Sequence, residues 1–137
     1  MRRSLWVMII GLFVLLSFFG TSFGQKKPPK RTAELLGQGR NLYEQNCLPC
    51  HGQKGDGKGA LSATLKPAPS DFAAPLNKWP NTKGDPQKIF DVISKGIPNS
   101  AMVKWDHLSE QERWALVYAV SEFATPAKAA PPAKKKK

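Results

Sequence analysis

The chain lacks the patterns of several common protein classes. No alternation of apolar and polar residues is long enough for a useful β-strand, and no βαβ pattern surrounds its Cys pair. The Gly-rich stretch 52–59 follows no strand and lacks the Gly-Lys-Ser/Thr ending of a phosphate-binding loop. No Ser, His and Asp residues form a candidate hydrolase site. These absences predict an all-α protein and argue against nucleotide-binding and hydrolytic functions.

The one long apolar run lies at the N-terminus. Within residues 1–24, two Arg residues precede an apolar run from Leu5 to Phe19, and small residues follow, as in a secretory signal. The run also approaches the length that spans a bilayer, so an uncleaved membrane anchor is the alternative. No Cys follows it, which excludes a lipoprotein cleavage site. Either interpretation predicts a periplasmic or otherwise extracytoplasmic protein.

Acidic residues are missing from both flanks of the chain. All ten Asp and Glu lie between residues 34 and 124, together with ten of the 21 Lys and Arg. The net charge of +11 therefore comes from the ends, and the central part is neutral. An exported chain with a neutral centre argues against nucleic-acid binding, in spite of a pI near 9.9.

Composition divides the chain into four parts. A signal peptide or anchor at 1–24 is followed by a Pro/Lys linker at 25–32, a folded domain at 33–124 and a Lys/Pro/Ala tail at 125–137. The tail has too few apolar residues to bury, so we expect it to be disordered. Its lysines, with those of the linker, are candidates for contact with an acidic partner or an anionic membrane, or only increase solubility.

Three helices are predicted within the folded domain by their start and stop signals. Thr32 is a good N-cap for the first helix. Asp85 followed by Pro starts the second, and Gly96 ends it. Ser109 and Glu112 form a capping box for the last. The Pro-rich stretch 61–80 excludes long helices, so we expect it to wall a cofactor pocket as irregular chain.

The first and last helices are predicted to pack together. Gly39, four residues before Tyr43, has no side chain to keep another helix away. Trp114, Val117 and Tyr118 make an apolar stripe on the last helix at helical spacing. We expect this stripe to pack against the Gly39 face.

The most specific motif is Cys47-Leu48-Pro49-Cys50-His51. Two Cys three residues apart, followed at once by His, form the attachment pattern for c-type haem. Residues three apart share a face of a helix, so both sulfurs can reach one group. The motif supplies three of the four ligands of a structural zinc site, and only His107 or a carboxylate remains as a fourth. A Cys47–Cys50 disulfide leaves His51 unexplained.

A second iron ligand follows from the position of the methionines. Met1 and Met8 lie in the export segment, which leaves Met102 as the one available to an exported domain. His and Met together are a common ligand pair in electron-carrying cytochromes. The alternatives are that Met102 fills a gap in the core, or that His107 binds the iron. Trp79 and Trp105 are candidates either for the wall of the haem site or for the core.

Together, these features resemble a class I cytochrome c, similar to the small single-haem bacterial domains of cbb3-type oxidase subunits. The resemblance rests on Cys47–Gly52, the Gly-Asp-Gly-Lys-Gly that follows, Gly96-Ile97 before Met102, and the helix of Trp114 and Tyr118. It implies an all-α fold of three to four short helices with irregular loops around one covalent haem c. One departure is Val103, since such domains often have Pro directly after the axial Met.

The resemblance also implies roles for individual residues. Cys47 and Cys50 would form the haem thioethers, and His51 and Met102 would bind the iron. The carbonyl of a loop proline, Pro67 or else Pro69, would accept a hydrogen bond from the ring of the proximal His.

The predicted function is electron transfer between redox proteins, in an extracytoplasmic chain of membrane complexes. An iron held from both faces has no open position for a substrate, so we expect a carrier or a subunit of an oxidoreductase. A haem peroxidase or gas sensor with a labile sixth ligand is the alternative.

Overall fold

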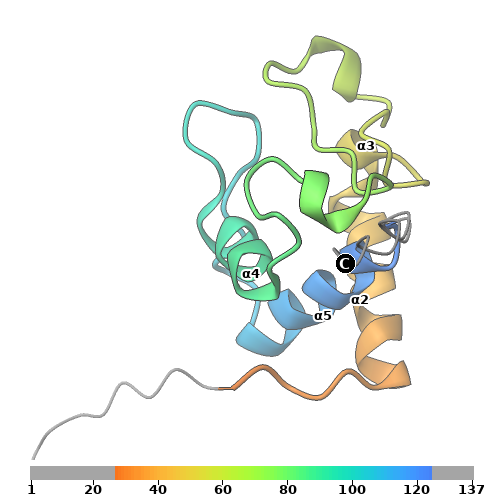
Figure 1. Cartoon of the computed structure of the whole chain (residues 1–137), viewed down its shortest axis with the longest axis vertical. Helices are drawn as coiled ribbons and strands as arrows, with labels where there is room; N and C mark the ends of the chain where they lie inside the picture. Colours follow the sequence, from red (N-terminus) through yellow and green to blue (C-terminus); the bar gives the residue numbers. More distant parts are fainter. Residues whose placement is uncertain (1–26, 125–137) are drawn as a thin grey trace, which may run out of the picture.

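A computed structural model describes residues 27–124, and this part of the chain is helical, with no strand (Figure 1). Its elements in chain order are α2 (Ala33–Asn46), α3 (Leu48–His51), the 3-10 turns η1 (Ser62–Thr64) and η2 (Leu76–Lys78), α4 (Pro86–Lys95) and α5 (Glu110–Ser121). The all-α prediction is thereby confirmed. The expected export segment and Lys-rich tail lie outside the described residues. Between 27 and 124 no helix is long and apolar enough to cross a bilayer.

Each of the three longer helices begins at its predicted cap. The Thr32 hydroxyl accepts a hydrogen bond from a first-turn amide of α2, and the Asp85 carboxylate accepts two from the first turn of α4. The Ser109 hydroxyl accepts from the amide of Glu112, whose carboxylate accepts from the amide of Ser109 in return. Each cap pairs amides that a helix leaves without an internal partner, which sets where the helix starts.

The pairing of α2 with α5 is the main helix contact of the fold, and Figure 1 shows the two helices side by side. A Cβ atom on Gly39 would lie 2.5 Å from the carbonyl carbon of Ala115 and 3.1 Å from the Cβ of Ala119. The two backbones are therefore in direct contact at Gly39, as predicted. Trp114 and Val117 of α5 are almost completely buried, with 2% and 0% exposure.

The buried face of helix α5 is wider than the predicted apolar stripe. Leu116 and Val120, outside that stripe, are as buried as Trp114 because α4 packs against α5 as well. The buried core consists of Tyr43, Trp79, Ile89, Ile93, Trp114, Leu116, Val117 and Val120. Complete burial of one such side chain contributes roughly 1.5–3 kcal/mol. The α5 helix thus joins the α2 side of the molecule to the α4 side.

Candidate functional site

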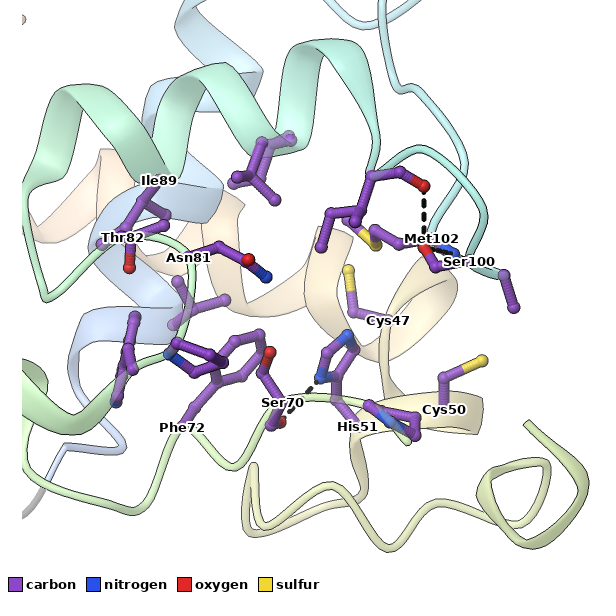
Figure 2. Close-up of a pocket in the computed structure, with 18 of the residues that line it drawn as sticks. Cys47, Cys50, His51, Ser70, Phe72, Asn81, Thr82, Ile89, Ser100 and Met102 are labelled. Atoms are coloured by element: carbon purple, nitrogen blue, oxygen red, sulfur yellow. Dashed lines mark hydrogen bonds between the residues drawn. The ribbon is translucent and has the colours of Figure 1, made fainter. Parts of the chain in front are cut away.

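A cavity of about 390 Å³ lies between α3, α4, α5 and the chain connecting α3 to α4. Cofactor sites typically measure roughly 300–1,000 Å³. Among the described residues, none with a charged side chain lines it. The four candidate ligands, Cys47, Cys50, His51 and Met102, all line it (Figure 2).

Three of these four residues are positioned by the single turn of α3. The amides of Cys50 and His51 both bond to the carbonyl of Cys47, at 3.2 and 2.8 Å. The Gly-rich loop then holds this turn from outside, since the Gly57 amide donates to the His51 carbonyl and the Gly59 amide to the Cys50 carbonyl. The motif is therefore fixed by backbone bonds on both sides.

The imidazole of His51 has one nitrogen paired and the other directed into the cavity. Nδ1 lies 3.1 Å from the carbonyl oxygen of Ser70, and since a carbonyl only accepts, Nδ1 carries the proton. The other nitrogen points into the cavity in Figure 2. Burial lowers the pKa of His51, and the Ser70 carbonyl partly opposes this shift. A neutral imidazole with a free lone pair is the form that binds a metal.

The carbonyl that accepts from His51 belongs to Ser70, so the expectation of Pro67 or Pro69 in this role is wrong. A Cβ on Gly57 would lie 2.6 Å from the Pro69 oxygen, which places that carbonyl against the Gly-rich loop. The next carbonyl along the chain, that of Ser70, is the one that faces His51. Pro67 still lines the cavity.

The two cysteines are free thiols, half-buried at the cavity. Burial, together with the nearby Cys50, raises the pKa of Cys47 to about 12, so its sulfur is protonated at neutral pH. A reactive or zinc-binding Cys is stabilised as the thiolate instead. Within residues 27–124, no three His, Cys, Asp or Glu side chains are grouped as a metal site.

Met102 lies in a loop after α4 that is closed by its own hydrogen bonds. The Ile97 amide donates to the Met102 carbonyl, and the Met102 amide donates to the Ser100 hydroxyl, at 3.0 and 3.1 Å. Gly96 turns the chain with a φ of 70°, and a Cβ there would lie 2.6 Å from the Met102 oxygen. Figure 2 shows Met102 reaching the cavity from a different side than His51.

The remaining candidates are His107, which lies outside the cavity, and Trp79 and Trp105, which line it. His107 is exposed and does not line the cavity; its ring lies 5.5 Å from that of Trp105. Trp79 and Trp105 line the cavity and also pack with the core, so both interpretations of them apply. The Trp79 indole N–H donates to the Ala74 carbonyl at 3.0 Å, which satisfies its one polar atom.

Several cavity residues were not singled out for this role from the sequence. Leu116 and Val120 wall it from α5, and their spacing of four was a signal that the predicted stripe left out. The ring of Phe72, which belongs to the stretch 61–80 expected to wall the pocket, stacks on the imidazole of His51, a contact that was not expected. Within residues 27–124, Thr82 is one of two buried polar or charged residues, with 6% exposure, and nothing in its sequence context marks it.

Comparison with known proteins identifies the family. A model of the family described as "Cytochrome C oxidase, cbb3-type, subunit III" matches residues 34–118. The chain belongs to this family of c-type cytochromes. The matched segment of the cytochrome contains the motif at Cys47–His51, the Met102 loop and most of α5.

A solved structure is also similar to this cytochrome. A chain of the Kuenenia stuttgartiensis reducing HAO-like protein complex aligns with a TM-score of 0.58 and 34% sequence identity. The alignment covers 72% of the cytochrome and 46% of that chain, so the cytochrome spans about half of its length or less. A comparison with curated proteins gives no match.

Membership of this family implies covalently bound haem, and the cavity suits such a group. Its walls are mostly apolar and carry no charged side chain, two free thiols lie at one side, and an imidazole and a thioether face into it. Thiols, imidazole and thioether are the groups that hold haem in cytochromes c.

Proposed function

We propose that this protein is an electron carrier with one haem c. Cys47 and Cys50 would hold the haem by thioether bonds, and His51 and Met102 would bind its iron from opposite faces. Pro67, Trp79 and Trp105 would wall the site. The observation that carries the proposal is the convergence of these two thiols, the imidazole and the thioether on one uncharged cavity.

The chain's own contribution would be to hold the ligands still and keep water out. Bound haem iron supplies one-electron chemistry, and a Met opposite a His raises its potential. The Ser70 carbonyl holds His51, and the loop hydrogen bonds of Ile97 and Ser100 hold Met102. With His51 and Met102 both on the iron, no coordination position would be left for a substrate.

Replacement of the axial Met tests this function. Met102→Ala should abolish the ferric Met–iron absorption band and lower the reduction potential, because thioether ligation raises it. His107→Ala is the matched control, since it removes the other candidate ligand, and it should leave both properties unchanged. If the native protein lacks this band, or if Met102→Ala leaves the band and the reduction potential unchanged, the ligand assignment is wrong.

The same measurements separate a carrier from haem catalysis. A native protein with both axial positions filled should bind carbon monoxide slowly, whereas Met102→Ala should bind it fast. Rapid binding by the native protein at neutral pH would instead support a peroxidase or gas sensor.

We further propose an extracytoplasmic location, with redox proteins as donor and acceptor. Domains of this family are typically extracytoplasmic, and the similar solved chain belongs to a protein complex, which is consistent with a complex subunit as well as a free carrier. The mass of the purified protein tests two points together. It should equal the chain without residues 1–24 plus one haem if the signal is cleaved, and the whole chain plus one haem if it is an anchor.

The Lys-rich tail, outside the described residues, is proposed to steer the protein to an acidic partner or anionic membrane. Deletion of residues 127–137 should slow reduction by the partner and weaken the salt dependence of the rate. An unchanged rate and salt dependence would refute steering by the tail.

A further inference from the structure

The face of the His51 imidazole is covered by the ring of Phe72. The two ring centroids are 4.3 Å apart and the planes differ by 14°, which is a stacked pair. The same imidazole is bonded through Nδ1 to the carbonyl of Ser70. Two residues of one short segment therefore contact the imidazole, one at its edge and the other on its face (Figure 2).

Phe72 is itself held in place from behind and through its backbone. Its amide donates to the Gly55 carbonyl at 2.6 Å. The ring of Trp79 lies 5.0 Å from its own at 45°, and Trp79 is only 3% exposed and anchored on the Ala74 carbonyl. The Phe72 ring is therefore enclosed between an anchored indole and the imidazole.

The two contacts restrict different motions of the imidazole. A hydrogen bond at Nδ1 fixes the direction of one N–H, but the ring can still tilt about that line. The second side-chain torsion of His is broad, so it adds little restraint of its own. A flat ring stacked on the imidazole face blocks the tilt, and the two contacts together define the imidazole plane.

We infer that Phe72 is a positioning residue that sets the plane of the proximal imidazole. The inference rests on the proposed function, because it takes His51 as the iron ligand. The orientation of an axial imidazole plane sets the splitting of the iron d orbitals. One fixed plane gives one ferric low-spin species, and a free plane gives several.

The test compares two identical substitutions at two stacked phenylalanines. Phe72→Leu removes the ring from the imidazole face. Phe90→Leu removes a half-buried ring that stacks on Trp114 at 4.7 Å and does not line the cavity. Phe72→Tyr keeps the stacked ring and serves as the conservative variant. Electron paramagnetic resonance of the ferric protein and the proton NMR shifts of the haem methyls measure the orientation of the axial ligand.

We expect Phe72→Leu to broaden or split the low-spin signal, to shift the haem methyl resonances and to shift the reduction potential. Phe90→Leu should lower the unfolding midpoint and leave the spectra unchanged, and Phe72→Tyr should give one wild-type-like species. Spectra of Phe72→Leu identical to wild type, or equal changes in Phe90→Leu, would overturn the inference. If Phe72→Leu attaches no haem, Trp79→Phe, which weakens the support behind Phe72, decides in the same way.

This result is distinguishable from failure of the proposed function. If the wild-type protein gives no low-spin signal from His and Met ligation, the function itself is wrong. If that signal is present and does not depend on Phe72, only the positioning role is wrong.

Discussion

Gly39→Ala tests how closely α2 and α5 pack. The added Cβ would lie 2.5 Å from the carbonyl carbon of Ala115, and a helix backbone cannot rotate away from it as a side chain can. Overpacking costs roughly 1–3 kcal/mol, and the rigid neighbour argues for the upper end. Ala has about 1 kcal/mol better helix propensity than Gly, so the expected net loss is about 2 kcal/mol.

Thermal unfolding followed by far-ultraviolet circular dichroism measures this loss. A domain of this size shifts by roughly 4–8 °C per kcal/mol, so the midpoint of Gly39→Ala should fall by about 8–16 °C. Gly37→Ala is the matched control in the same helix, because a Cβ there meets nothing within 4 Å. The unfolding midpoint of Gly37→Ala should rise, because Ala in place of Gly stabilises a helix by up to about 1 kcal/mol. If both variants raise the midpoint, the close contact of the two helices is not present.

Three further substitutions test polar contacts of the fold. Tyr43→Phe should lower the free energy of unfolding in urea by roughly 0.5–1.5 kcal/mol, because it removes the buried hydrogen bond of the hydroxyl to the Gly52 carbonyl at 2.7 Å. The Gly52 carbonyl still accepts from the Gly55 amide, so the substitution leaves no carbonyl unpaired. Ser109→Ala should cost about 1 kcal/mol through loss of the α5 cap. The same cap lowers the pKa of Glu112 below its ordinary value of 4.5, so its contribution is complete above that pH and is lost as the pH falls through the folded-state pKa. Glu122→Gln should cost less than about 1 kcal/mol, because its ion pairs with two arginines are partly exposed, and the cost should shrink in high salt.

Two of these expectations have a control variant, and the third has a salt test. Ser109→Asp retains a good N-cap and should keep the stability that Ser109→Ala loses. Tyr118→Phe removes a hydroxyl bonded to the Pro29 carbonyl in a less buried position, so it should cost less than Tyr43→Phe. An effect of Glu122→Gln that is equal at low and high salt would contradict its assignment to ion pairs.

The boundaries of the helices were predictable because they depend on local chemistry. Thr32, Asp85 and Ser109 each pair the first amides of the helix that follows, and this needs no knowledge of the rest of the fold. The close approach at Gly39 was predictable for the same reason, since a glycine inside an apolar helix face has few other uses. The four candidate ligands were also named from motif and position alone, and the structure brings them to one cavity.

The surroundings of His51 were not predictable, because they depend on the path of a long loop. Which carbonyl meets the imidazole is decided by the contact of Pro69 with Gly57, a pairing of residues twelve positions apart that no local pattern encodes. The stacking of Phe72 on His51 has the same origin. An apolar residue between prolines indicates burial, and only the folded chain shows which group it covers.

The attachment of the segment before α2 has a mechanical consequence. The Pro29 carbonyl accepts a hydrogen bond from Tyr118, and Arg31 pairs with Glu122, so this segment is fastened to α5 before the first helix begins. The 14 residues of α2 then extend about 21 Å toward α3. If a tether precedes this segment, its point of rotation would therefore lie before Pro29. The cavity would move about that point together with α2 as one rigid unit. The distance between such a tether and the cavity would then include the length of this helix.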